Sequence, residues 1–183
     1  MTKSRVILQD LQFKLTIERL CHQLIEEYQD FSNACIIGIQ ERGVQLSDRI
    51  VEQLAVINPT LTIPYGKIDI TFYRDDYRRR ETPLMASNTE MDFIVEKKEV
   101  ILIDDVLYSG RTIQAGLIAI GHYGRPKRVE LLNLVDRRFN RDLPIQPNYT
   151  GITVDAIDEA YVKVEWEKAD GKDQIILFPT KQS

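Results

Sequence analysis

Short aliphatic segments alternate with longer amphipathic segments along most of this chain. The aliphatic segments, such as CIIGI and VILI, are nearly continuous, which is typical of strands buried on both faces of a parallel sheet. The longer segments place apolar residues at the spacing of a helix face. We therefore predict an α/β fold with a central, mostly parallel sheet flanked by helices. The predicted strands are 34–39, 100–103 and 128–135, and the predicted helices are 11–28, 43–56 and 112–123.

Other parts of the chain depart from this alternation. Residues 63–73 contain the alternating sequence YGKIDITFY and predict an extended segment. Residues 74–99 are polar and aperiodic, which favours a mobile loop that returns to the sheet. Near the end of the chain, Gly171 predicts a turn that makes the last two strands a hairpin. The C-terminal strands are expected at 152–156, 162–167 and 174–178, and the apolar side of the first helix at Leu11, Leu15, Leu20, Leu24 and Ile25.

The composition limits the class of protein. A length of 183 residues and an apolar fraction of 43% fit one globular domain. A net charge of −4 provides no general basic field for nucleic acid. No apolar run has the length of a membrane span and the N-terminus lacks the core of a signal peptide, so we expect a cytoplasmic protein. Cys21 and Cys35 are isolated and predict free thiols, while His22 and His122 lack the spacing of zinc ligands.

The segment VILIDDVLYSGRT, residues 100–112, carries the most specific candidate chemistry. Asp104 and Asp105 follow a predicted buried strand, and ligands of open α/β sheets bind at the carboxyl ends of such strands. The next residues offer backbone N–H groups, hydroxyls and a guanidinium at a helix start, a combination that suits a phosphate monoester. Paired carboxylates suit the vicinal hydroxyls of a sugar. Taken alone, an aspartate pair after a strand is more often a solvated turn or a helix N-cap.

The whole segment resembles the signature with which type I phosphoribosyltransferases bind phosphoribosyl pyrophosphate (PRPP). Three more segments occur in order: IGIQERGVQLSDRI at 37–50, KIDITFYRDD at 67–76 and LVDRRFNRDLPI at 134–145. Together the four segments resemble the PyrR family of pyrimidine operon regulators and uracil phosphoribosyltransferases. The resemblance implies the type I phosphoribosyltransferase fold, as a single domain over residues 1–183, with a small hood formed by the chain ends.

The resemblance also implies a role for each segment. The acid pair would accept hydrogen bonds from the ribose hydroxyls, the next loop would hold the 5-phosphate, and the turn after the first predicted strand would hold pyrophosphate. A flexible lid would cover the site, and the base would lie under the hood. The implied residues are Asp104 and Asp105 for ribose; Val106, Leu107, Tyr108, Ser109, Gly110, Arg111 and Thr112 for the 5-phosphate; Glu41, Arg42, Gly43 and Arg74 for pyrophosphate; Asp75, Asp76 and Arg78 for the lid; and Asp136, Arg137 and Val154 for the base. The alternatives are an ordinary helix start at 41–43 and a solvated loop at 78–80.

The implied activity is the synthesis of UMP and pyrophosphate from uracil and PRPP. Mg²⁺ would be held mainly by substrate oxygens and water, as is usual for this ion. Purine-salvage members carry an acidic residue where this chain has Tyr108, which favours a pyrimidine substrate. A purine-type phosphoribosyltransferase stays open as an alternative. The family also implies a homodimer or a larger homo-oligomer.

Family members bind the leader RNA of pyrimidine genes, with uridine nucleotides as co-ligands. Arg19 and His22 match the basic face of the first helix, and Arg138 and Arg141 complete the candidate RNA face. Three glutamates surround the first pair, and the chain reads Arg-Phe-Asn-Arg where the regulator pattern has Gly-His-Arg. Like charge opposes phosphate, so we expect weak RNA binding. An RNA-binding attenuator with little catalysis is the second alternative.

Overall fold

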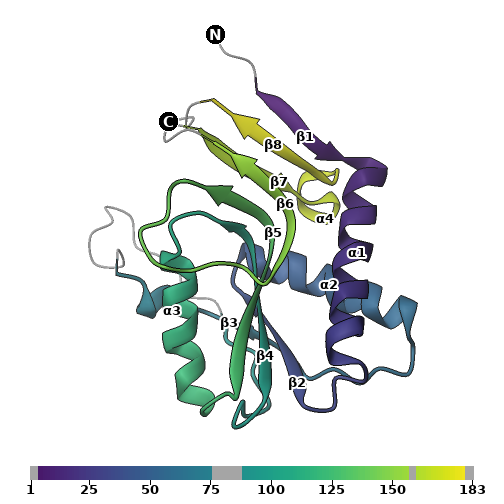
Figure 1. The fold of residues 1–183 in the computed structure, drawn as a ribbon, viewed down its shortest axis with the longest axis vertical. Coiled ribbons are helices and arrows are strands. Elements are labelled where there is room, and N and C mark those ends of the chain that lie inside the picture. Colours follow the sequence, from purple (N-terminus) through teal and green to yellow (C-terminus); the bar gives the residue numbers. More distant parts are fainter. Residues whose placement is uncertain (1–3, 76–87, 157–159, 180–183) are drawn as a thin grey trace.

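The structure, a computed structural model, describes residues 4–75, 88–156 and 160–179. A parallel sheet of five strands, in the order β3-β2-β4-β5-β6, forms its centre. Helices α1 (Asp10–Tyr28) and α2 (Arg42–Ile57) cover one face and α3 (Arg111–Ile120) covers the other (Figure 1). The strands are β2 (Ala34–Ile39), β3 (Tyr65–Ile68), β4 (Glu99–Leu107), β5 (Arg128–Arg138) and β6 (Tyr149–Asp155). The predicted α/β fold is therefore confirmed.

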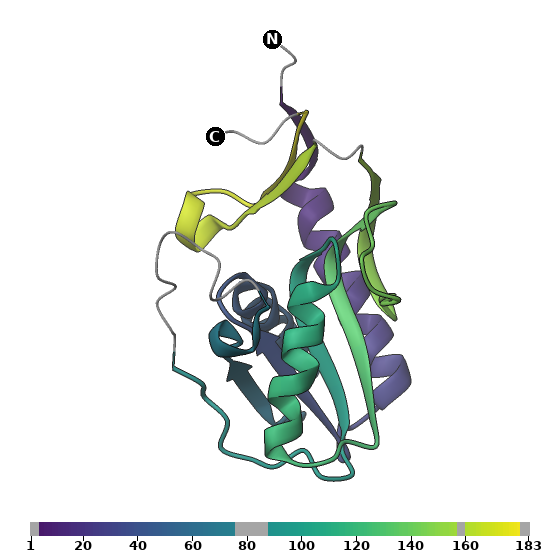
Figure 2. The ribbon, with the colours of Figure 1, turned by 90° about the vertical axis from the view of Figure 1, so that its left-hand side faces the viewer.

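A second, antiparallel sheet stands over the carboxyl end of the central sheet, as a separate layer in Figure 2. Its strand order is β1-β8-β7, so it joins both ends of the chain and forms the expected hood. The strands are β1 (Arg5–Gln9), β7 (Tyr161–Glu165) and β8 (Gln174–Phe178), with the short helix α4 (Glu167–Asp170) between the last two. The β7–β8 hairpin was predicted, whereas β1 was missed because β8, the strand with which it pairs, lies at the other end of the sequence.

The central strands bury both faces, as their continuous apolar sequence predicts. In β4, Ile101 and Ile103 pack on the α1 and α2 side, and Val100 and Leu102 pack on the α3 side. This alternation follows from the two-residue period of a strand. The strand is thereby held rigidly between two helical layers, and its carboxyl end can position a site.

Helix α1 buries the predicted side in its second half, where Leu20 and Leu24 are 0% exposed and Ile25 packs against the core, but its first turns differ from the prediction. Leu11 is 67% exposed and Leu15 is 51% exposed, although both were expected on the apolar side. The buried side of the first turns instead carries Phe13 and Ile17. The ring of Phe13 contacts Trp166 edge-on at 5.5 Å, so packing against the hood sets the rotation of the helix.

Several predicted boundaries also change. Strands β4 and β5 continue past residues 103 and 135, and α3 ends at Ile120, where a 3₁₀ turn (Gly121–Tyr123) follows. Of the extended segment 63–73, only Tyr65–Ile68 is a strand, because β3 is an edge strand that pairs with β2 over four residues. Thr71–Tyr73 forms a 3₁₀ turn. Within the polar interval, Glu90 returns to pair with Lys67.

Among the residues that the structure describes, no helix is both long and apolar enough to span a membrane.

Candidate active site

The acid pair lies inside β4 rather than after it. Asp104 and Asp105 are each 7% exposed, and the backbone N–H of Asp105 donates to Asp104 Oδ1 at 3.0 Å. Burial raises the pKa of Asp105 to about 6, against the opposing attraction of Arg42. Burial and then the charge of Asp105 raise the pKa of Asp104, against the attraction of Arg74. Carboxylates removed from water in this way are strong acceptors for a hydroxyl donor.

A cavity of about 570 Å³ opens on one side of this pair. It is lined by Arg74, Asp75, Asp104 and the run of residues 106–113. Gly110 has a φ of 91° and forms the N-cap of α3, so the chain turns sharply from strand to helix. The cavity thus combines a helix N-terminus with a cation, which suits a phosphate group.

The turn between β2 and α2 approaches the acid pair from another side. The Gln40–Glu41 peptide is cis, and α2 begins at Arg42. A Cβ atom on Gly43 would lie 2.6 Å from the carbonyl oxygen of Ile103 and 3.0 Å from Cα of Asp104. Only glycine therefore lets the start of α2 come this close to β4.

A second cavity, of about 390 Å³, lies between the acid pair and the hood. The guanidinium of Arg42 crosses this space and donates to the carbonyl of Val164 in β7 at 2.9 Å. Arg137, 4% exposed, places its guanidinium 4.0 Å from the centre of the Tyr108 ring. The cavity is lined by Arg42, Asp105, Val106, Tyr108, Arg137 and residues 160–164 of the hood.

The two cavities meet at the acid pair. Val106 and Tyr108 line both of them, while Asp104 faces the first and Asp105 the second. An extended ligand that passes over the carboxylates would therefore have one end at the start of α3 and the other under the hood.

Of the three residues expected at the base, the structure places only Arg137 on the hood cavity. Val154 packs in the core on the α1 side, because β6 turns it away from the site. The carboxylate of Asp136 accepts from Arg141 and lines a different cavity. The hood residues 160–164 were missed. Their alternating sequence predicts a strand but does not tell which edge of the central sheet that strand will cover.

The candidate RNA residues do not share one kind of environment. Arg19 and His22 are exposed on α1, and Arg19 donates to the carbonyl of Gly151. Arg138 pairs with Asp155 through two contacts, at 2.7 and 2.8 Å. The side chain of Arg141 is 21% exposed and hydrogen-bonded within the protein. Its guanidinium therefore makes contacts within the protein and is largely shielded from solvent.

The structure describes only part of the segment expected to form a lid. Asp75 forms an ion pair with Arg111, and Arg74 lines the first cavity. Asp76 and Arg78, like the alternative of a solvated arginine run at 78–80, lie outside the described residues.

Comparison with known proteins shows the family of this chain. The family model of the phosphoribosyl transferase domain matches residues 5–169. The bifunctional protein PyrR of Microcystis aeruginosa is 45% identical over 167 residues, which cover 91% of this chain and 93% of the relative. This chain belongs to the PyrR family of type I phosphoribosyltransferases. The PyrR protein of Haemophilus ducreyi is 38% identical over 95% of this chain and 96% of its own length.

Solved structures show the same fold at lower identity. A hypoxanthine phosphoribosyltransferase of Trypanosoma cruzi superposes with a TM-score of 0.70 at 13% identity, over 97% of both chains. One of Staphylococcus aureus has a TM-score of 0.68 at 18% identity, over 94% of this chain and 90% of the other. The type I fold is therefore shared between this PyrR-family chain and enzymes that act on purines.

Proposed function

We propose that this PyrR-family protein is a uracil phosphoribosyltransferase that makes UMP and pyrophosphate from uracil and PRPP. The observation that carries the proposal is the junction of two cavities at Asp104 and Asp105. One cavity suits a phosphorylated sugar and the other a planar base. The ribose C1 atom, which exchanges pyrophosphate for uracil, would lie between them.

We place PRPP in the first cavity and across the turn at Arg42. The ribose hydroxyls donate to Asp104 and Asp105, and the 5-phosphate lies against residues 108–112 at the start of α3. Pyrophosphate lies at residues 41–43, where Arg42 supplies a fixed positive charge, and Arg74 adds another from the lid side. Asp75 belongs to the lid and meets Arg111 across the cavity.

Uracil fits the outer edge of β7. In an antiparallel pair, alternate residues direct their backbone groups away from the neighbouring strand. The Val164 carbonyl accepts from Arg42, so it points away from β8, and Val162 lies on the same edge two residues earlier. A free strand edge offers both N–H and C=O groups, which complement the carbonyl and N–H edge of uracil. Tyr108 and Arg137 close the cavity at the side of the central sheet.

The chemistry requires positioning and charge rather than a protein nucleophile. N1 of uracil forms a bond to C1 of the ribose as the bond from C1 to pyrophosphate breaks, the N1 proton passes to the departing pyrophosphate or to water, and the attacking and leaving atoms must stay in line. Arg42 stabilises the negative charge that develops on the leaving group, and the buried carboxylates stabilise the positive charge on the sugar.

Mg²⁺ is the metal that we expect with PRPP, where it neutralises charge on the pyrophosphate. Asp104 and Asp105 would supply oxygen donors of the kind this ion prefers, beside the backbone N–H groups that they already accept from. No cluster of three or more His, Cys, Asp or Glu residues that could hold a metal occurs within residues 4–75, 88–156 and 160–179. We therefore propose that the substrate itself provides most of the ligands.

The direct test is release of pyrophosphate from PRPP and Mg²⁺ with a panel of bases. We expect turnover with uracil and the appearance of UMP. Turnover with guanine or hypoxanthine but not with uracil would instead support the purine-type alternative. Absence of turnover with every base, together with tight UMP-dependent binding of leader RNA, would support the attenuator alternative.

Replacing both acids, in Asp104→Asn with Asp105→Asn, should nearly abolish turnover. The amides keep the shape but lose charge-assisted hydrogen bonds, each worth roughly 1.5–3 kcal/mol. Steady-state kinetics with PRPP as the varied substrate measures the loss, and circular dichroism checks the fold. A rate loss of less than about tenfold would mean that each such bond contributes far less than this range, and that the pair does not hold the ribose.

A further inference from the structure

The side chain of Arg141 forms the centre of a contact between two segments that are distant in sequence. Its guanidinium donates to the carbonyls of Leu107 at 3.2 Å, Tyr108, and Arg137 at 3.1 Å. It also donates to the carbonyl of Ile145 at 3.0 Å and pairs with the carboxylate of Asp136. Only the planar fork of an arginine can supply donors in so many fixed directions.

Backbone contacts extend this attachment. We call residues 139–147 the strap, because they lie along the outside of the loop 108–110 that joins β4 to α3. The N–H groups of Asp142 and Leu143 donate to the carbonyl of Ser109 at 3.0 and 3.3 Å. The carboxylate of Asp142 accepts from Nε of Arg111 at 2.8 Å. The loop is thus fixed to the strap by main chain and side chains together.

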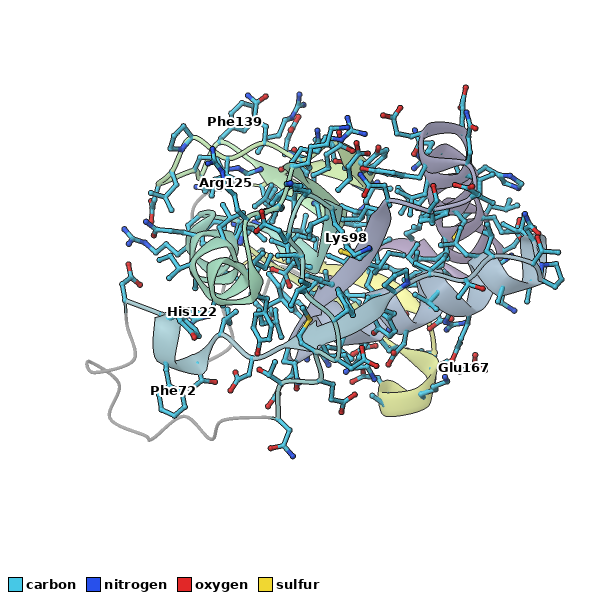
Figure 3. All side chains as sticks on the ribbon, turned by 90° about the horizontal axis from the view of Figure 1, so that it is seen from below. Phe72, Lys98, His122, Arg125, Phe139 and Glu167 are labelled. Atoms are coloured by element: carbon cyan, nitrogen blue, oxygen red, sulfur yellow. The ribbon has the colours of Figure 1, made fainter. Side chains whose placement is uncertain are left out.

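Side-chain packing closes the remaining space between the loop and the strap. A Cβ atom on Gly110 would lie 3.2 Å from Cδ1 of Ile145 and 3.5 Å from Cβ of Leu143. By contrast, Phe139 at the start of the strap is 78% exposed and lies at the edge of the molecule (Figure 3). The contacts between the strap and the loop therefore come from residues 141–145 of the strap.

These contacts determine where the loop directs its N–H groups. In a planar trans peptide, the N–H of one residue points opposite to the carbonyl of the residue before it. The carbonyls of Tyr108 and Ser109 point to the strap, so the N–H groups of Ser109 and Gly110 point away from it. The cavity of about 570 Å³ is lined by the same loop residues but by none of the strap. Adjacent N–H groups directed to one side form a concave anion site.

We propose that Arg141 is a positioning residue for the 5-phosphate, which it orients through the carbonyls of Leu107 and Tyr108. The inference rests on the proposed function, because it assumes that a sugar phosphate binds in this cavity. The same guanidinium holds Asp136 and the Arg137 carbonyl, so it joins the phosphate loop to the strand that carries Arg137 to the base cavity. This role differs from the RNA contact that the family resemblance implies for Arg141.

Binding measurements on the whole protein test this role without turnover. Ribose 5-phosphate carries the 5-phosphate and the hydroxyls, whereas inorganic pyrophosphate should use the separate turn at Arg42. In Arg141→Ala we expect ribose 5-phosphate to bind roughly 10- to 100-fold more weakly by calorimetry, because the loop N–H groups lose their alignment. Pyrophosphate should bind as it does to the wild type. Arg125→Ala removes an equal charge from the opposite end of the sheet and should change neither affinity.

Chemical rescue separates positioning from general loss of structure. Arg141 lines an open cavity on the strap side, so free guanidinium can reach the vacated position. In Arg141→Ala, low concentrations of guanidinium should restore the affinity for ribose 5-phosphate, whereas equal sodium chloride should not. Arg141→Lys should bind weakly, because one ammonium cannot serve the carbonyls on both sides.

Each outcome bears on a defined claim. Equal weakening of ribose 5-phosphate and pyrophosphate in Arg141→Ala, or unchanged binding of both, would overturn the role of Arg141 and leave the proposed function standing. Failure of the wild type to bind ribose 5-phosphate would instead contradict the proposed function itself.

Discussion

Burial sets the protonation of the acid pair, and this predicts the pH dependence of catalysis. Asp105 is usually ionised above a pKa of 3.8, but in β4 its pKa is about 6. In the proposed complex the ribose hydroxyls donate to the ionised carboxylates, so kcat/KM for PRPP should rise with pH through about 6 as Asp105 ionises, and the raised pKa of Asp104 should extend the rise to higher pH. A profile that is flat between pH 5 and 8 at constant ionic strength, roughly the range over which such a group titrates, would contradict this assignment.

The same shift predicts the pH dependence of stability. An acid whose pKa is raised by folding binds more protons in the folded state, so its contribution to the unfolding free energy falls as pH rises from 3.8 to about 6. Asp105→Asn removes this buried charge. The variant should therefore melt at a higher temperature than the wild type above that range, and the difference should shrink toward pH 4, near the ordinary pKa of the group. Thermal unfolding of the wild type and the variant at several pH values measures the difference in melting temperature and its dependence on pH.

Beside the acid pair, Asn133 contributes unfavourably to stability. It is 0% exposed, pairs in register with Asp104, and neither polar atom of its amide has a hydrogen-bond partner. Asn133→Val should raise the unfolding free energy by roughly 1–3 kcal/mol, because it removes two buried unsatisfied groups. Asn148→Val is the matched control, and it should destabilise the protein because Asn148 accepts from the N–H of Leu131. Urea unfolding that shows Asn133→Val to be less stable than the wild type would reject the prediction.

At the scale of elements, the approach of α2 to β4 depends on Gly43. A methyl group there would meet the Ile103 carbonyl at 2.6 Å, so Gly43→Ala must push the start of the helix away from the acid pair. We expect a loss in kcat/KM on the order of tenfold or more and destabilisation of about 1–3 kcal/mol. Gly121→Ala should leave both unchanged, because no atom lies within 4 Å of its added Cβ. Equal effects of the two substitutions would show that the close approach is not required.

At the scale of the whole molecule, charge argues against tight RNA binding. The net charge is −4, Glu18, Glu26 and Glu27 lie on α1 near Arg19 and His22, and Arg138 is paired with Asp155. We expect a pyrimidine-leader hairpin, titrated with protein and UMP, to bind weakly and to lose affinity steeply between low and physiological salt. Tight binding that UMP strengthens and that survives physiological salt would contradict this.

A homodimer or larger assembly stays our expectation, and sedimentation of the free protein tests it.

Local patterns in the sequence determined most elements of the central sheet. The aliphatic segment 34–39 has the predicted bounds, because it is a continuous apolar run closed by polar residues. The hood strand 174–178 also has the predicted bounds. The order of strand, acid pair, loop and helix was also evident, since these residues are contiguous in the sequence. Such features are local and can be predicted from one sequence.

Contacts between distant segments decided the rest. The pairing of β1 with β8 joins the two chain ends, and β7 could be placed over the acid pair only once that sheet had formed. Arg141 has the sequence context of a surface arginine, yet its guanidinium turns inward because backbone carbonyls of three separate segments converge on it. The sequence therefore determined which groups are present at the site. The tertiary structure decided which of them face one another, because hydrogen-bond direction and burial depend on neighbours that are remote along the chain.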